Sequence, residues 1–148
     1  MSNPDGIAFA TTIEVRDACL CLHLQRAARA VARRFDAAFR PFGLTSGQFS
    51  LLMSLNRPEP PTLGSVAALL AMDRTTLTAN LKPLERRGLV RVAVDPEDRR
   101  SRRLILTPAG GAVLTAAVPV WRATHAAVDG LLPGGDPAPL RTGLRALS

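Results

Sequence analysis

Tyrosine is absent from this chain of 148 residues, and aromatic residues make up only 4% of it. The core must therefore be built mainly from Ala, Leu and Val, which favour packing between helices. The two cysteines, Cys19 and Cys21, lie too close together to cross-link a fold, so a secreted scaffold built on disulfides is excluded. The N-terminus lacks the pattern of a signal peptide, and no apolar run is long enough to span a membrane. We expect a cytoplasmic protein that has no membrane segment.

Residues that carry enzymatic chemistry are also scarce. The two histidines, His23 and His125, are isolated, and the chain shows no Ser-His-Asp set, pair of carboxylates, metal-binding cluster or phosphate-binding loop. We therefore expect no enzymatic activity, no cofactor and no metal site. Hydrophobic residues make up 47% and charged residues 21% of the chain, and these values are typical of a globular domain.

Positive charge is concentrated in one segment of the sequence. The net charge of the chain is +7, and +5 of it falls between Arg74 and Arg103, where nine basic residues accompany four acidic ones. Such a local basic patch is typical of nucleic-acid binding. Charge alone leaves three alternatives open: a chance cluster on a solvated surface, an acidic protein partner, and an anionic membrane surface.

Hydrophobic periodicity predicts helices at both ends of the chain. Residues 1–11 are expected to be flexible. A long helix is predicted over residues 13–40, and its length indicates a surface beyond one small core, such as a subunit interface. Towards the C-terminus, an Ala-rich helix is predicted over residues 107–131 with a kink at Pro119, and a short helix over residues 140–147.

The segment between these helices opens with a clear helix start. Thr45 and Gln48 fit a capping box for a helix over residues 45–55. A short helix is predicted over residues 63–70, and residues 71–72 form a tight turn after it.

The pattern then changes from helical to extended. Asp73 is a good N-cap for a helix over residues 74–87, and Gly88 suits the left-handed position after its last turn. Alternating apolar residues predict two strands, over residues 90–94 and 102–106, joined by a turn of mostly charged residues.

Two short helices joined by a tight turn, followed by a hairpin with a basic tip, predict a winged helix-turn-helix. In such a domain the first helix braces the second, which enters the major groove of DNA. An ordinary polar helix face is the alternative for the second helix taken alone. Its outward side chains suit contacts to bases and phosphates, and they are Arg74, Thr75, Thr76, Thr78, Ala79, Asn80 and Lys82.

The hairpin tip is the second predicted contact region. A narrow minor groove concentrates negative potential and attracts an inserted arginine. Asp98 and Arg100 are two residues apart, so on extended backbone they point to the same side, and the carboxylate would orient the guanidinium. A solvated run of charge is the alternative. The residues of this tip are Asp98, Arg99, Arg100, Arg102 and Arg103.

Three segments carry a resemblance to the MarR family. They are Gly43–Leu52, Leu63–Val90 and Asp95–Gly110. The last, DPEDRRSRRLILTPAG, joins an acidic and basic wing to the pattern Leu-Thr-x-x-Gly, and it is highly specific. The helices on either side match in pattern, so the resemblance extends over about residues 13–148.

The resemblance implies a mainly α fold of the α+β type, a winged helix-turn-helix with long N- and C-terminal dimerisation helices. Residues 1–148 would form a single domain. Within it, residues 45–107 would form the DNA-binding lobe, and residues 12–42 and 108–148 the dimerisation lobe.

The resemblance also implies a function. The chain would be a sequence-specific DNA-binding transcriptional regulator, a homodimeric repressor released from a palindromic operator by a small-molecule effector. Carried over by position, Arg74 to Lys82 would be recognition-helix contacts. Arg100, held by Asp98, would be the arginine in the minor groove.

Cys21 suggests an alternative, which is a thiol-based redox sensor. Its spacing of 24 residues from Thr45 resembles that of the peroxide-sensing cysteine in one branch of this family. A thiol near a helix start can react with peroxide. That branch supports its cysteine with tyrosines, whereas Gln25 and Phe35 stand at the matching positions here, and no third cysteine is present to resolve a sulfenic acid. A small buried apolar side chain is the other interpretation.

Overall fold

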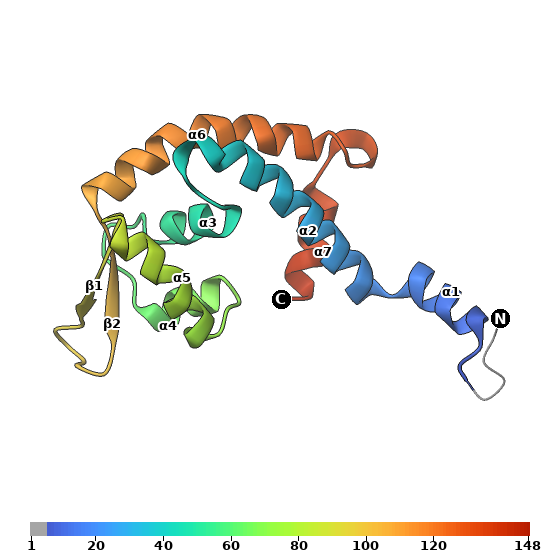
Figure 1. The fold of residues 1–148 in the computed structure, drawn as a ribbon, viewed down its shortest axis with the longest axis horizontal. Helices are drawn as coiled ribbons and strands as arrows, with labels where there is room; N and C mark the ends of the chain where they lie inside the picture. The colour runs from blue at the N-terminus through green and yellow to red at the C-terminus, as the bar shows by residue number, and fades with distance from the viewer. Residues whose placement is uncertain (1–5) are drawn as a thin grey trace.

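The computed structural model describes residues 6–148. The described chain folds into helices at both ends and a small mixed lobe between them (Figure 1). In chain order the elements are α1 (Phe9–Ala18), α2 (Leu20–Phe39), a 3-10 turn (Arg40–Phe42), α3 (Ser46–Ser54), α4 (Leu63–Leu69), α5 (Arg74–Arg86), β1 (Val90–Val94), β2 (Arg102–Leu106), α6 (Pro108–Asp129), a second 3-10 turn (Pro133–Gly135) and α7 (Ala138–Ala146).

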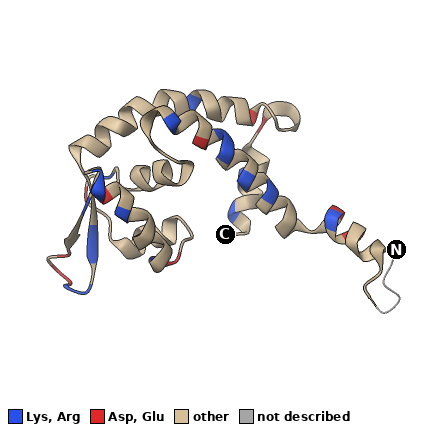
Figure 2. Ribbon diagram, in the orientation of Figure 1, with Lys and Arg blue, Asp and Glu red and all other residues tan. Residues whose placement is uncertain are grey.

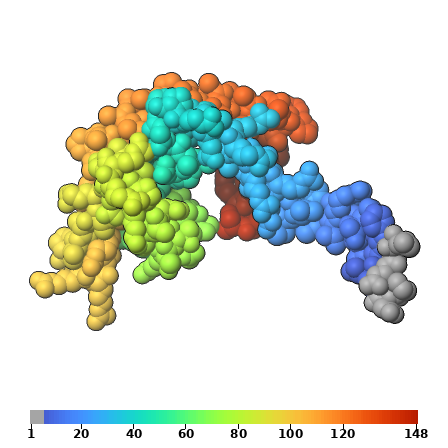
Figure 3. Space-filling view, in the orientation of Figure 1, coloured from blue at the N-terminus to red at the C-terminus, as the bar shows by residue number. Residues whose placement is uncertain are grey.

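These elements form an arch. The long helices α2 and α6 pack side by side along its top, and the lobe of α3, α4, α5 and the hairpin hangs from one end (Figure 1). The space-filling view shows the hollow between this lobe and the rest of the chain (Figure 3). Within residues 6–148, none of the helices is long and apolar enough to cross a membrane.

The core lies where the arch meets the lobe. Phe39 at the end of α2 stacks on Phe49 of α3, with ring centroids 4.5 Å apart. Leu52, Leu77 and Leu104 are completely buried around this pair. Because the core joins the last turn of α2 to the lobe, the orientation of the lobe depends on the long helices.

A second contact fixes the end of α5 to the same junction. Gly43 ends the 3-10 turn after α2 with a left-handed φ of 64°. The Arg87 guanidinium donates to the carbonyls of Gly43 and Phe42, at 2.6 and 3.2 Å. A Cβ on Gly43 would lie 3.1 Å from the Arg87 Nη2, so glycine serves both the turn and the contact.

The N-terminal helix differs from the prediction. Helix already begins at Phe9, so the expected flexible segment of residues 1–11 is wrong for its last three residues, and residues 1–5 lie outside the described part. The predicted helix over 13–40 is broken at Cys19, whose ψ of 107° is extended. The Cys19 thiol then caps the new helix by accepting from the backbone N–H of Leu22 at 3.5 Å.

The other predicted elements are confirmed, with small shifts at their ends. The capping box is present, since Thr45 Oγ1 accepts from the Gln48 N–H and Gln48 Oε1 accepts from the Thr45 N–H. The two strands pair antiparallel, with Val90 opposite Leu106. The helix α6 runs through Pro119 and ends at Asp129, two residues earlier than expected.

Candidate nucleic-acid interface

The α5 helix is fixed by its cap and its leucines. Asp73 accepts from the backbone N–H of Thr76 at 2.8 Å and from the Thr76 hydroxyl at 2.8 Å. These bonds, the backbone one first, hold the pKa of the Asp73 carboxyl below its usual value of 3.8, because they favour the charged form. Leu77, Leu81 and Leu84 are buried on one side, so the opposite side of the helix faces outward.

The outward side is a shallow depression of about 350 Å³. Its lining contains five of the side chains that the sequence predicts for the recognition helix: Arg74, Thr75, Thr78, Ala79 and Lys82. Thr78 Oγ1 donates to the Arg74 carbonyl at 2.8 Å, so this hydroxyl is already engaged in the free protein.

Two of the predicted contacts lie on the flank of α5. Thr76 is bonded to Asp73, and Asn80 directs its Nδ2 to the sulfur of Met72 at 3.6 Å. Both side chains are exposed. A step of four residues places them on the same flank of the helix, beside the depression rather than inside it.

The hairpin of β1 and β2 projects beyond α5 as the predicted wing (Figure 1). Its tip is organised by backbone contacts. Asp98 Oδ1 accepts from the backbone N–H of Arg100 at 3.0 Å, instead of pairing with the Arg100 guanidinium as the sequence suggested. Arg102 Nη1 donates to the carbonyls of Arg99 and Ser101, at 3.0 and 3.2 Å, and so closes the tip on itself.

The sequence pattern did not reveal a partly buried ion pair at the base of the wing. Asp95 is 4% exposed and accepts from Arg103 Nε at 3.0 Å and from the backbone N–H of Glu97 at 2.9 Å. Arg103 also donates to the Pro60 carbonyl at 2.9 Å. These two bonds engage the Arg103 guanidinium, so Arg103 holds the base of the wing in the free protein. The hairpin register would have signalled the pair, because Arg103 stands opposite Ala93 and Asp95, two residues after Ala93, lies on the same face of the hairpin.

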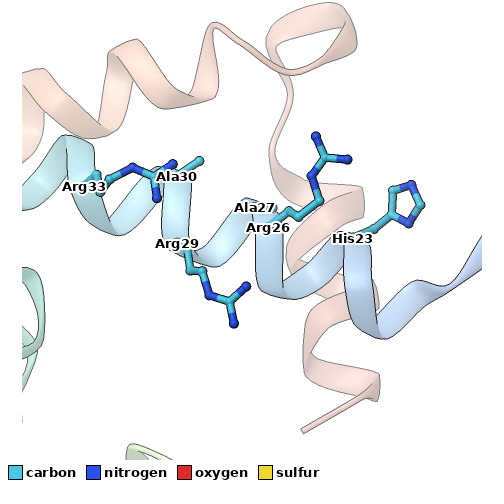
Figure 4. Close-up of a pocket in the computed structure, with 6 residues that line it drawn as sticks. All are labelled: His23, Arg26, Ala27, Arg29, Ala30 and Arg33. Atoms are coloured by element: carbon cyan, nitrogen blue, oxygen red, sulfur yellow. The ribbon is translucent and has the colours of Figure 1, made fainter. Parts of the chain in front are cut away.

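Basic residues occur on α5, on the wing and along α2 (Figure 2). The α2 group surrounds a depression of about 530 Å³ lined by His23, Arg26, Ala27, Arg29, Ala30 and Arg33. Figure 4 shows its side chains spreading from one helix, with Arg29 directed away from Arg26 and His23. None of these arginines has an acidic side chain within ion-pair distance in residues 6–148.

Comparison with known proteins identifies the family. The sequence profile of the MarR family matches residues 44–101. The transcriptional regulator HosA of Escherichia coli is 34% identical over 95 residues, which cover 63% of this chain and 69% of that protein. The structure of the transcriptional regulator MosR of M. tuberculosis in complex with DNA is 40% identical, with a TM-score of 0.79, and the match covers 87% of this chain and 92% of that one.

The chain belongs to the MarR family. The resemblance found in the sequence and the predicted fold class, a mainly α winged helix with one small antiparallel sheet, are confirmed. The repressor CouR bound to a 23-mer DNA duplex is a further similar structure, 31% identical with a TM-score of 0.79, covering 90% of this chain and 94% of that one. The chain spans 59–62% of the length of the first curated relatives that it matches.

A groove in this MarR-family chain lies between the lobe and α6. It has a volume of about 510 Å³, and its walls come from α3, α4 and α6. Trp121 lines it, and the ring centroids of Trp121 and His125 lie 4.9 Å apart. Phe35 does not line the groove: it packs against Phe39, with ring centroids 5.8 Å apart, at the edge of the core. The other lining residues are Phe49, Ser50, Met53, Ser54, Leu69, Leu70, Val118 and Arg122.

The two cysteines are both free in this MarR-family chain. Cys21 is exposed and accepts from Gln25 Nε2 at 3.3 Å, while Cys19 is half-buried. The interpretation of Cys21 as a small buried apolar residue is therefore wrong for the single chain. Residues 6–148 contain no group of three or more His, Cys, Asp or Glu side chains that could hold a metal ion.

Proposed function

We propose that this chain is a sequence-specific DNA-binding transcriptional repressor. One observation carries the proposal: the depression on α5 and the wing arginines meet around a shared cavity, lined among others by Arg74, Thr78 and Arg100. A recognition helix and a wing on one surface can engage a major groove and the adjacent minor groove of the same duplex. The DNA complexes of MosR and CouR, at 40% and 31% identity, support the same partner.

Binding to DNA is tested by selection from a random duplex library, followed by gel shift with the selected and scrambled sequences. We expect a palindromic site with half-sites about 10 base pairs apart. Affinity should fall steeply with salt, because phosphate contacts release counterions. Equal affinity for selected and scrambled duplexes would contradict sequence-specific binding. Repression is tested by a reporter gene carrying the selected site in its promoter.

The proposal includes a homodimer, with residues 45–107 as the DNA-binding lobe and residues 12–42 and 108–148 as the dimerisation lobe. The helix α7 supports it, because Leu140, Leu144 and Leu147 form one apolar stripe and are 40–58% exposed. The helix α1 adds exposed Phe9 and Val15 and buries none of its residues. Such faces are consistent with coverage by a second copy.

Sedimentation velocity tests the dimer. Leu144→Glu should shift the protein towards monomer, whereas Thr142→Glu, on another face of α7, should leave the assembly unchanged. A wild type that sediments as a monomer at every concentration would contradict the proposal.

Release by a small molecule is the next element of the proposal. The groove at Trp121 combines apolar walls with Arg122, which suits an aromatic or aliphatic organic anion. CouR of Rhodococcus jostii, 25% identical, has been crystallised with p-coumaroyl-CoA. Trp121 is the single tryptophan of the chain, so its fluorescence reports on the groove.

Titration with p-coumarate and p-coumaroyl-CoA, followed by tryptophan fluorescence and gel shift, tests this release. A ligand of the groove should quench Trp121 and release DNA over the same concentration range. Leu69→Arg, at the wall of the groove, should abolish both responses, while Leu131→Arg outside it should not. DNA release that persists in Leu69→Arg would place the effector elsewhere.

A thiol-based redox regulator is the second candidate. The exposure of Cys21, together with the amide hydrogen bond to its sulfur, favours it. Peroxide titration of wild type, Cys21→Ser and Cys19→Ser, read by DNA release, decides the matter. If Cys21 is the sensor, only Cys21→Ser should lose the response. Identical responses of the three proteins would eliminate the thiol mechanism.

A further inference from the structure

A cavity of about 440 Å³ lies between α4, α5 and the wing. Three arginines and one acidic residue contribute to its walls, so the surrounding formal charge is positive. The complete lining consists of Thr62, Leu63, Gly64, Arg74, Thr78, Asp98, Arg100, Ser101 and Arg102.

The position of Arg74 depends on Gly64. A Cβ on Gly64 would lie 3.0 Å from Arg74 Nη2 and 3.7 Å from Arg74 Cζ, so the guanidinium rests over the first turn of α4. Arg74 also borders the depression on the outer face of α5. Arg74 therefore lies between the outer face of α5 and the wing.

Most of the polar side chains around the cavity already make hydrogen bonds within the protein, but the Arg74 guanidinium does not. Asp98 Oδ1 accepts from the Arg100 N–H, the Thr78 hydroxyl donates to the Arg74 carbonyl, and Arg102 Nη1 donates to carbonyls of the wing tip. The Arg74 guanidinium makes none of the side-chain hydrogen bonds formed within residues 6–148. Its planar fork of donors is free to bind an anion in a bidentate manner.

The geometry of a duplex indicates which anion this is. The sugar–phosphate backbone is the wall that separates the major groove from the minor groove. If α5 occupies the first and the wing the second, as the proposed function requires, the backbone must pass through the space between them. We propose that this cavity binds a phosphate of the DNA backbone, and that Arg74 is a phosphate anchor and not a base-reading residue.

This inference rests on the proposed function and adds a role for Gly64. The glycine leaves room for the guanidinium to lie back over α4, where it faces the backbone instead of the base edges. Phosphate contacts set the register of a protein on DNA, whereas base contacts set its sequence preference. The other side chains on the outer face of α5, which remain to read bases, are Thr75, Thr78, Ala79 and Lys82.

The first test compares Arg74→Ala with Thr75→Ala in the full-length chain, using the selected duplex and its single-base-pair variants over a range of salt. Arg74→Ala removes a charge-assisted bidentate contact, so the affinity of this variant for every duplex should fall about ten- to hundredfold. Its slope of log affinity against log salt should fall by about 0.9 for each protomer bound. Thr75→Ala should keep the slope and change the preference at one base pair.

The second test uses Gly64→Ala alone and together with Arg74→Ala. The added methyl should displace the guanidinium, so Gly64→Ala should weaken DNA binding in the wild-type background and have no effect in the Arg74→Ala background. Gly111→Ala is a matched control, because a Cβ there meets no atom within 4 Å. Circular dichroism melts confirm that each variant is folded.

The outcomes separate this inference from the proposed function. Selective DNA binding by the wild type, with an Arg74→Ala defect confined to one base pair and an unchanged salt slope, would overturn the phosphate role alone. A Gly64→Ala defect of equal size in both backgrounds would overturn the role of Gly64. A wild type that binds no duplex would overturn the proposed function and the phosphate site with it.

Discussion

Gly110 and Gly111 are neighbours at the start of α6 and have opposite surroundings. A Cβ on Gly110 would lie 2.3 Å from the carbonyl oxygen of Leu89 and 2.7 Å from Leu106 Cδ1, whereas a Cβ on Gly111 would meet no atom within 4 Å. The Leu89 carbonyl already accepts from the Thr107 N–H at 3.1 Å. Moving this carbonyl away from a new methyl group would therefore strain the bond that joins the wing to α6.

The expected free energies follow from these contacts. Replacing glycine by alanine in a helix gains up to about 1 kcal/mol, and less near the first turn. Overpacking at Gly110 costs about 1–3 kcal/mol, and weakening the Leu89 bond costs about 1 kcal/mol more. We expect Gly110→Ala to lower the free energy of unfolding by about 2–3 kcal/mol, and Gly111→Ala to leave it unchanged or raise it slightly.

Thermal and urea unfolding of the two variants and the wild type measure this difference. The three proteins are compared at equal concentration, because self-association raises the apparent stability. For a chain of this size the loss in Gly110→Ala should lower Tm by roughly 5–10 °C. Equal Tm values for Gly110→Ala and Gly111→Ala would refute the close approach of α6 to the base of the wing.

Two acidic residues give further predictions. Asp95→Asn leaves the half-buried Arg103 without its charged partner and should lower the free energy of unfolding by about 1–3 kcal/mol in urea, whereas the exposed Asp98→Asn should have little effect. Because the pKa of Asp73 is lowered in the folded state, its contribution to stability is present above the ordinary value of 3.8 and is lost as pH falls through the lower, folded value. Asp73→Asn keeps a cap that does not titrate, so the Tm difference between wild type and variant should be constant near neutral pH and change only below about pH 4. A Tm difference that changes around pH 6 instead would assign the effect to another group.

The features that the sequence predicted correctly are those decided within a few residues. Asp73 lies three residues before the N–H that it caps, and the leucines of α5 recur at helical spacing, so both follow from local geometry. The same periodicity leaves the position of Asn80 on the helix surface undecided. It shares a flank with Thr76, four residues earlier, and only the placement of the leucines shows that this flank lies beside the outer face.

The features that were missed depend on contacts between distant segments. The break at Cys19 has no proline or glycine to mark it, and an extended ψ at a single residue interrupts a pattern that remains helical on both sides. Arg103 donates to the carbonyl of Pro60, which is 43 residues away, and the position of the Arg74 guanidinium depends on Gly64, which lies on another helix. When such contacts within the fold are unknown, the sequence predicts all the polar and charged residues of α5 and the wing alike as DNA contacts.

The short helix α4 connects the two regions to which we assign binding. Gly64 in its first turn lies under the guanidinium of Arg74, and Leu69 at its end lines the groove that contains Trp121. Five residues of helix separate them by only about 7.5 Å. If a ligand that displaces Leu69 moved α4 as a whole, Gly64 would tilt or shift with it. Since Arg74 rests within 3.0 Å of the space that a Cβ on Gly64 would occupy, even a small displacement of α4 would change the position of the proposed phosphate anchor. Release of DNA would then need no contact between the ligand and α5 itself.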